Sequence, residues 1–210
     1  MLEGEMGVYT GSSRQGKTAA LKQKIRDHKR VVVWSVKEKI DQYGEVWPDT
    51  HYVQTIAGLK RALIERASAR RFRIVFMPSR LSEFTDFCRL AYAWAMCGHS
   101  INLHTTVVAE ELSDVTNPGK APETWGVLIR QGLGWGANIY ALTQRPAESD
   151  KTVMGNATYI HAHYSKRAQD RKYVADEMDV SPEEINKLAK LEWLESRHGE
   201  PIKRGKVRFK

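Results

Sequence analysis

The 210-residue sequence lacks long apolar runs, which limits where the protein can reside. No stretch of about 18 consecutive apolar residues occurs, so no transmembrane helix is predicted. The first residues, Met-Leu-Glu-Gly-Glu, have neither the basic region nor the apolar core of a secretory signal. These two absences lead us to expect a cytoplasmic protein.

Cysteine is scarce in this sequence. Cys88 and Cys97 are the only two, and both fall in one apolar stretch that is expected to be helical. We interpret them as reduced, buried thiols, as is usual in cytoplasmic proteins. No group of cysteines and histidines has the spacing of a structural zinc site. His161 and His163 would share one face of a strand, and we interpret this pair as structural.

Repeats and low-complexity segments are also missing, and apolar residues make up 41% of the chain, which is a globular composition. The length fits one domain with an ordinary hydrophobic core. The net charge of +8 suits a polyanionic partner such as nucleic acid, and it equally suits solubility alone. Five of the last eight residues are cations, for which a solvated edge strand is the simpler interpretation: Lys203, Arg204, Lys206, Arg208 and Lys210.

The apolar residues predict strands that alternate with helices. Such alternation indicates an α/β fold with a mostly parallel sheet. We expect strands at residues 6–10, 31–36, 73–77, 105–109, 138–143 and 157–163. We expect helices over residues 17–28, after caps at Thr55 and Ser82, and from the Ser181-Pro182-Glu183-Glu184 capping box through Ile185, Leu188 and Leu191.

Residues 11–18 read Gly-Ser-Ser-Arg-Gln-Gly-Lys-Thr and lie between the first predicted strand and the first predicted helix. A phosphate-binding loop has this pattern, and chance produces it in roughly 1 of 100 chains of this size. Gly11 and Gly16 permit turns that aim successive backbone N–H groups at one spot. Lys17 would place a cation between the β- and γ-phosphates of ATP, and the Thr18 hydroxyl would bind Mg²⁺. The predicted nucleotide-binding residues are Gly11, Ser12, Ser13, Arg14, Gln15, Gly16, Lys17, Thr18 and Ala19.

Two carboxylates, Glu110 and Glu111, follow the predicted strand at 105–109. Parallel strands place ligand chemistry at their C-terminal ends. Consecutive residues of a strand point to opposite faces, so the two acids are expected to have different roles. We assign Glu110 to Mg²⁺, directly or through water, and Glu111 to the water that attacks the γ-phosphate.

A polar end also follows the predicted strand at 138–143, where the chain reads Gln144-Arg145-Pro146. In a P-loop sheet, the strand between the two motif strands ends near the γ-phosphate. A neutral amide at that point can sense whether the γ-phosphate is present. We therefore expect Gln144 to belong to the hydrolysis site.

Residues 130–146, Arg-Gln-Gly-Leu-Gly-Trp-Gly-Ala-Asn-Ile-Tyr-Ala-Leu-Thr-Gln-Arg-Pro, resemble the FtsK–HerA superfamily of DNA-pumping ATPases. The phosphate loop and the acidic strand end occur in the same order and at compatible distances, so the resemblance covers roughly residues 6–165. The small size looks most like the genome-packaging ATPases of tectivirus-type membrane-containing icosahedral viruses. The resemblance implies one RecA/ASCE-type P-loop domain over residues 1–210, with C-terminal helices and a short basic extension after residue 165.

The resemblance also carries over to particular residues. Glu110 stands where the superfamily commonly has aspartate. The usual position of the arginine finger holds Leu133, and Arg130 lies one helical turn earlier. Arg130 is thus the candidate finger, and Arg145 is its competitor.

The function implied by the resemblance is an ATP-driven motor that moves viral double-stranded DNA into a preformed capsid. It implies a hexamer-like ring around the DNA, capsid or vertex proteins as partners, and a location in the host cytoplasm or at a packaging vertex of the virion. The loop at residues 113–123, with Lys120, is a candidate pore loop. The alternatives are a DNA-transfer or phage-assembly ATPase of the same superfamily, a P-loop small-molecule kinase, and a nucleotide-gated binding protein.

Overall fold

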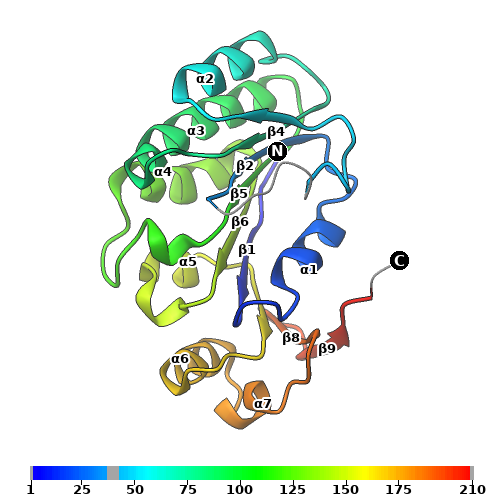
Figure 1. Ribbon diagram of the computed structural model, residues 1–210, viewed down its shortest axis with the longest axis vertical. Helices are drawn as coiled ribbons and strands as arrows, with labels where there is room; N and C mark the ends of the chain where they lie inside the picture. The colour runs from blue at the N-terminus through cyan, green and yellow to red at the C-terminus, as the bar shows by residue number, and fades with distance from the viewer. Residues whose placement is uncertain (1, 37–42, 209–210) are drawn as a thin grey trace.

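Nine strands of the described chain form one sheet, in the order β3-β4-β2-β5-β6-β1-β7-β8-β9 (Figure 1). The computed structural model describes residues 2–36 and 43–208. The strands are β1 (Met6–Thr10), β2 (Arg30–Trp34), β3 (His51–Val53), β4 (Phe72–Phe76), β5 (Thr105–Ala109), β6 (Ala137–Thr143), β7 (Tyr159–His163), β8 (Glu192–Arg197) and β9 (Lys203–Lys206). The α-helices are α1 (Lys17–Lys24), α2 (Ile56–Glu65), α3 (Phe84–Ser100), α4 (Glu123–Gly132), α5 (Lys151–Gly155), α6 (Ala168–Met178) and α7 (Pro182–Asn186).

The strands from β1 to β7 pair in parallel, and β8 and β9 are antiparallel additions to one side of the sheet. The predicted α/β fold with a mostly parallel sheet is therefore confirmed. β1 lies between β6 and β7, and β5 lies on the other side of β6. This order brings the C-terminal ends of β1, β5 and β6 together at one edge of the sheet.

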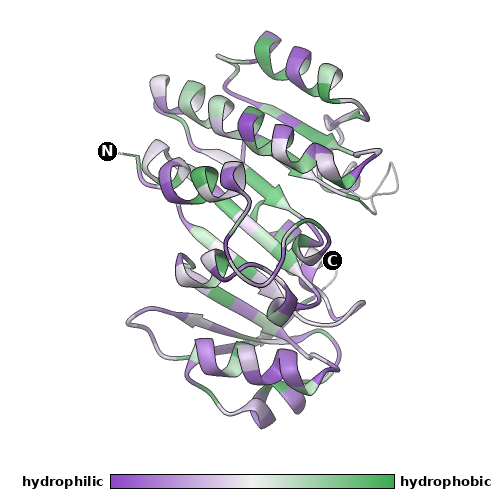
Figure 2. Cartoon of the chain, turned by 90° about the vertical axis from the view of Figure 1, so that its left-hand side faces the viewer, coloured by the Kyte–Doolittle hydropathy of each residue, from purple (hydrophilic) through white to green (hydrophobic). Residues whose placement is uncertain are grey.

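Helices cover both faces of the sheet, which explains why the parallel strands read as continuous apolar runs. On one face, Leu21 of α1 and Ile25 just after it pack with Tyr9, Val33 and Val108 from the strands. On the other face, α3 and α4 contribute much of the larger core, and these helices lie to the left of the sheet in Figure 1. Figure 2 shows the strands behind helices that carry both hydrophilic and hydrophobic residues.

The predicted elements agree with the structure along most of the chain. Each of the six predicted strands is present, with ends displaced by two residues at most. Thr55 caps α2 as expected, because its side chain accepts a hydrogen bond from the Gly58 N–H at 3.1 Å. The predicted helix over 17–28 ends at Lys24, because the chain must turn before β2 begins at Arg30.

Two predictions of helix position are wrong. Ser82 lies inside a short 3₁₀ turn, Leu81–Glu83, and the Glu83 carboxylate accepts hydrogen bonds from the N–H groups that precede α3. The capping box at Ser181 is present, but α7 ends at Asn186. Leu191 then adopts a left-handed backbone with φ of 72°, so the apolar spacing that predicted a longer helix instead leads into β8.

The chain after residue 165 was predicted to hold helices and a short basic extension, and that extension is not confirmed. β8 pairs with β7 over Glu192–Arg197, and β9 pairs with β8. Lys203 and Arg204 lie in β9, an edge strand, which agrees with the simpler interpretation of the cationic end. Lys210 lies outside the described residues.

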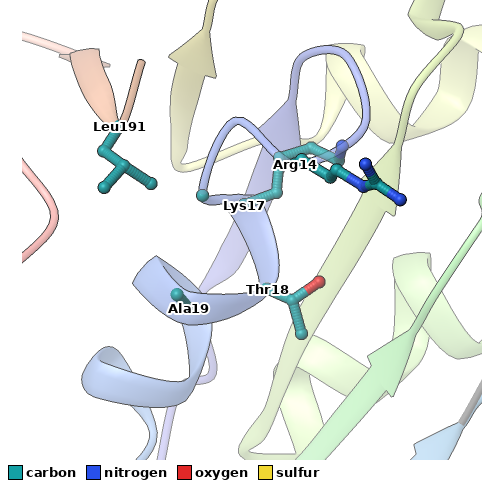
Figure 3. Close-up of a pocket in the computed structure, with 6 residues that line it drawn as sticks. Arg14, Lys17, Thr18, Ala19 and Leu191 are labelled. Carbon is teal, nitrogen blue, oxygen red and sulfur yellow. The ribbon is translucent and has the colours of Figure 1, made fainter. Parts of the chain in front are cut away.

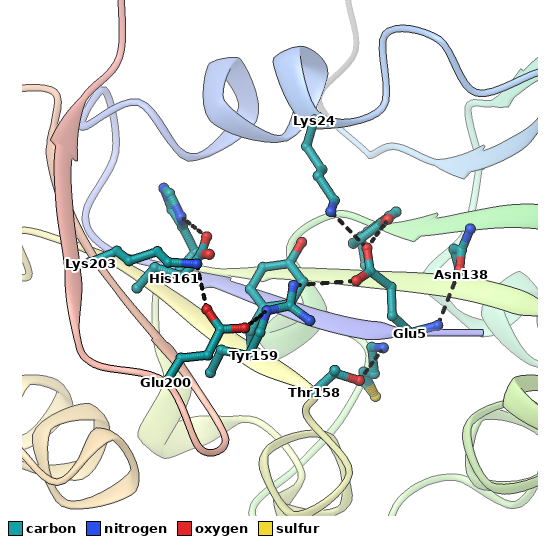
Figure 4. Close-up of polar contacts among 12 residues, drawn as sticks. Glu5, Lys24, Asn138, Thr158, Tyr159, His161, Glu200 and Lys203 are labelled. Carbon is teal, nitrogen blue, oxygen red and sulfur yellow. Dashed lines mark hydrogen bonds and ion pairs between the residues drawn. The ribbon is translucent and has the colours of Figure 1, made fainter. Parts of the chain in front are cut away.

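Polar contacts beneath α1 fasten β8 to the parallel sheet (Figure 4). The Glu5 carboxylate binds Lys24 of α1 at 3.0 Å and Arg197 of β8 at 3.4 Å, and it accepts a hydrogen bond from the Tyr140 hydroxyl at 2.8 Å. His161 and Glu195 pair at 2.9 Å between β7 and β8. These contacts hold β8 against β7 and against the start of β1.

Candidate nucleotide-binding site

The loop between β1 and α1 is shaped by two glycines with left-handed backbones. Gly11 has φ of 135° and Gly16 has φ of 112°, conformations that side chains strongly disfavour. A Cβ at Gly11 would lie 2.8 Å from the Cβ of His163, so the chain beneath the loop also excludes a side chain there. The sequence pattern therefore corresponds to a real steric requirement.

The start of α1 is suited to an anion. Gly16 caps the helix with no side-chain hydrogen bond, and no acidic residue lies in the first turn, so the positive end of the helix dipole is not neutralised by a carboxylate. The Lys17 ammonium is buried and donates to the carbonyls of Gly11 at 2.6 Å and Ser12 at 3.0 Å. These features fit the phosphates of a nucleotide. The Lys17 side chain would contact them by turning away from the loop carbonyls that it now binds.

A pocket joins this loop to the ends of β5 and β6. Its lining comprises Ser13, Arg14, Lys17, Thr18, Glu110, Glu111, Leu142 and Gln144. The structure thus brings together Lys17 and Thr18 with both predicted acids and the predicted amide. This convergence depends on the strand order. β5 and β6 are far from β1 in sequence, but in the sheet β6 lies next to β1 and β5 lies next to β6.

Glu110 is buried at the end of β5, and both of its carboxylate oxygens have protein donors. The Ser35 hydroxyl donates to Oε2, and the Tyr43 hydroxyl donates to Oε1 at 2.9 Å. Burial raises the pKa of Glu110, and the two hydrogen bonds oppose that shift. A carboxylate held in this way is better placed to bind a metal's water ligand than the metal itself.

Glu111 occupies a different environment from Glu110, as expected. The expected cause, that consecutive strand residues point to opposite faces, is wrong. The strand ends at Ala109, and Glu111 has a left-handed backbone with φ of 51°, so strand alternation does not apply. Both acids line the same pocket. Gln144 donates to the Glu111 carboxylate with an Nε2–Oε1 distance of 2.5 Å. The backbone reversal therefore turns Glu111 toward the end of β6, while Glu110 stays against Ser35.

The two candidate finger arginines lie outside the pocket of their own chain. Arg130 is exposed near the end of α4, and its guanidinium folds over Gly126. Within the described ranges, no acid forms an ion pair with Arg130. Arg145 follows Gln144 directly, but its guanidinium pairs with Glu148 at 3.1 Å. Arg130 is therefore the arginine that a neighbouring molecule could engage without first breaking an ion pair.

Three residues at the site were not identified from the sequence. Ser35 and Tyr43 hold Glu110, and His163 lies beneath Gly11. Ser35 follows β2, so the rule that parallel strands carry ligand groups at their C-terminal ends could have pointed to it. Only the pairing of β2 with β5 shows which acid it serves.

His163 is fully buried, and this predicts a pH dependence of stability. Its Nδ1 lies 2.9 Å from the Glu192 carbonyl, and Lys17 and His161 are the charged or titratable groups that disfavour its protonation. Burial, the largest cause, lowers the pKa of His163 from 6.5 to about 3. Below pH 6.5 the unfolded chain takes up a proton that the folded chain refuses, so the free energy of unfolding should fall as the pH drops toward 3.

The expected size of this effect is about 3 kcal/mol between pH 6.5 and 4. Urea unfolding of the wild type and of His163→Gln at several pH values measures it. The variant should lose less stability on acidification, whatever its stability at pH 7. His198→Gln, which replaces an exposed histidine, is the control and should follow the wild type. Parallel curves for wild type and His163→Gln would contradict the assignment.

A phosphate loop between a central parallel strand and its helix, with acids and an amide at the ends of the neighbouring strands, defines a P-loop NTPase. No family model matches the chain. Protein P9 of Pseudoalteromonas phage PM2 is 28% identical over 189 residues, which cover 88% of this chain and 79% of that protein. Genome packaging NTPase B204 from Sulfolobus turreted icosahedral virus 2, in complex with ATP-gammaS, is similar over 98% of both chains, with a TM-score of 0.75 and 12% identity.

A more distant solved structure is the pCW3 conjugation coupling protein TcpA with ATPgS. Its TM-score is 0.58 at 12% identity, over 98% of this chain and 61% of that one. These structures confirm the P-loop NTPase fold and the predicted resemblance to viral packaging NTPases and their relatives. In the part of the chain that the structure describes, no helix has the length and apolar character needed to cross a bilayer.

Proposed function

We propose that this chain is an ATPase that drives viral double-stranded DNA into a preformed capsid. The observation that carries the proposal is the pocket in which Lys17 and Thr18 meet Glu111 and its hydrogen-bond partner Gln144. A small-molecule kinase needs no such pairing of an acid with an amide at the γ-phosphate side.

Each side chain in the pocket has a role in this proposal. The loop amides and Lys17 hold the phosphates, and Arg14 lines the same pocket. Thr18 and, through water, Glu110 would hold Mg²⁺, which neutralises charge on the phosphates when bound. Glu111 orients and deprotonates the attacking water. Gln144, at 2.5 Å from Glu111, reports the state of the γ-phosphate to the acid.

The comparisons favour packaging over the related DNA-transfer role. The TM-score to the B204 packaging NTPase is 0.75, whereas it is 0.58 to the TcpA conjugation protein. The basic surplus of +8 supports a partner with a phosphate backbone, which such a protein would grip without reading bases. Lys120, exposed in the loop before α4, is the candidate pore cation.

The proposal includes a ring of identical subunits, in which each subunit is a single domain. Arg130 of one subunit reaches the pocket of its neighbour. An arginine supplied from a second molecule stabilises charge on the transferring phosphoryl group. The ring would work at a capsid vertex, in contact with capsid proteins. We propose that the protein is located in the host cytoplasm and at the packaging vertex of the virion.

The test of the motor is stimulation of ATP hydrolysis by double-stranded DNA. We expect hydrolysis by the purified protein to rise roughly tenfold or more with DNA of any sequence, and the stimulation to decline as salt increases. Lys17→Ala should abolish hydrolysis with and without DNA, which excludes a contaminating ATPase. Lys60→Ala, a change to an exposed lysine on α2, serves as the matched control and should behave as wild type.

Three other results would each point elsewhere. Hydrolysis that ignores DNA at every salt concentration would contradict the motor. A phosphorylated small molecule as product would indicate a kinase. Turnover near zero together with tight DNA binding would indicate a nucleotide-gated binding protein.

A further inference from the structure

A second hollow adjoins the phosphate loop on the side away from the acids. It is lined by Arg14, Gly16, Lys17, Thr18, Ala19 and Leu191. Figure 3 shows Leu191 facing the start of α1 across this hollow, while the Arg14 side chain extends to the opposite side. Arg14, Lys17 and Thr18 also line the pocket that holds Glu111 and Gln144. The two spaces therefore lie on either side of the same phosphate-binding residues.

Leu191, the residue before β8, forms one wall of this hollow. A Cβ placed at Gly16 would lie 3.2 Å from Leu191 Cδ2 and 3.3 Å from Val207 Cγ2. The Val207 N–H donates to the Leu191 carbonyl at 2.9 Å, so that carbonyl is already engaged. Leu191, just before β8, and Val207, just after β9, thus lie together beside the phosphate loop.

Leu191 holds a backbone conformation that leucine disfavours. Its φ of 72° lies in the left-handed region, which costs roughly 1–2 kcal/mol for a residue with a Cβ. Glycine or asparagine would be the usual residues at such a position. The leucine at this position contributes its side chain to the lining of the hollow.

We propose that this hollow takes the nucleoside of a nucleoside triphosphate and binds its base by apolar contact alone. The inference rests on the proposed function, because it requires the phosphates to lie between Lys17 and the acids. The described residues that line the hollow but not the acid pocket are Gly16, Ala19 and Leu191, and none has a polar side-chain atom. The protein is therefore an NTPase that discriminates weakly among bases, because strong discrimination requires hydrogen bonds to the base edge.

The first experiment compares ATP, GTP, CTP and UTP as substrates of the wild type. We expect their kcat/KM values to agree within about 200-fold, the most by which apolar contact alone separates related ligands. A preference for ATP over GTP of more than about 200-fold would overturn the inference, because it would require hydrogen bonds to the base edge. This comparison needs no variant.

The second experiment removes the wall of the hollow with Leu191→Gly. Glycine accepts the left-handed backbone, so the fold should be retained, and Leu191→Asn is the alternative if it is not. The KM for each nucleotide should rise about tenfold with kcat changed by less than about twofold, since the contact binds ground state and transition state equally. Inhibition by inorganic tripolyphosphate, which has no nucleoside, should be unchanged.

Asp179→Gly is the matched control, because Asp179 also has a left-handed backbone, with φ of 54°, and is exposed at the end of α6. It should leave every KM unchanged. An unchanged KM in Leu191→Gly, or an equal loss of tripolyphosphate inhibition, would overturn the inference. Equilibrium binding of nucleotides, measured without DNA, tests the nucleoside site alone. Failure of the proposed motor would appear only in the DNA-stimulated hydrolysis assay.

Discussion

Glu111→Gln should bind ATP as the wild type does and fail to hydrolyse it. We expect kcat to fall roughly 10²–10⁴-fold, the usual loss when a general base is removed. The substituted amide can still accept the hydrogen bond that Gln144 donates to Glu111 across 2.5 Å, so the shape of the pocket should be preserved. Nucleotide affinity by calorimetry and phosphate release by a steady-state assay measure the two halves of this prediction.

Glu110→Gln is the informative comparison for this result. Its carboxylate accepts hydrogen bonds from Ser35 and Tyr43 and is assigned to the metal, so its loss should weaken Mg²⁺-dependent binding as well as hydrolysis. Glu177→Gln, at an exposed position on α6, controls for the loss of one negative charge. If Glu111→Gln stays active while Glu110→Gln does not, the roles of the two acids are reversed.

Arg130→Ala should lose hydrolysis roughly 10³-fold or more, the range found when an arginine finger is removed. α4 precedes β6 and therefore runs toward the edge where the strands begin, away from the phosphate loop. Arg130, near its end, cannot serve the pocket of its own chain without a large rearrangement. Arg145→Ala should cost much less, because that guanidinium is held by Glu148.

Mixing two inactive variants tests whether Arg130 acts on a neighbour. In a ring that contains Arg130→Ala and Glu111→Gln subunits, some sites combine an intact Glu111 with an intact Arg130 from the adjacent subunit. The mixture should recover measurable activity, although each variant alone is inactive. Arg89→Ala, at an exposed arginine on α3, should remain fully active. A mixture with no activity, or a larger loss in Arg145→Ala than in Arg130→Ala, would reject Arg130 as the finger.

The fold was predictable from the sequence where local patterns coincide with burial. The strands at 6–10 and 105–109 are bounded by a glycine loop and by two acids, so their ends were visible in the sequence. The C-terminal part was not, because Ile185, Leu188 and Leu191 fit a helical period although the chain leaves the helix at Asn186. The left-handed turn at Leu191 contains no glycine that would have predicted it. Pairing with β7 then determines the conformation of the residues that follow.

The sequence by itself determined the phosphate loop, since two glycines, a lysine and a threonine at fixed spacing impose the turn and the charge locally. It also placed Glu110, Glu111 and Gln144 at strand ends. Only the tertiary structure decided which of these meet, because the strand order sets β6 beside β1 and β5 beside β6, more than 90 residues along the chain from β1. Packing likewise gave Glu110 its donors and brought Leu191 to the loop, which are contacts between segments with no local signal in common.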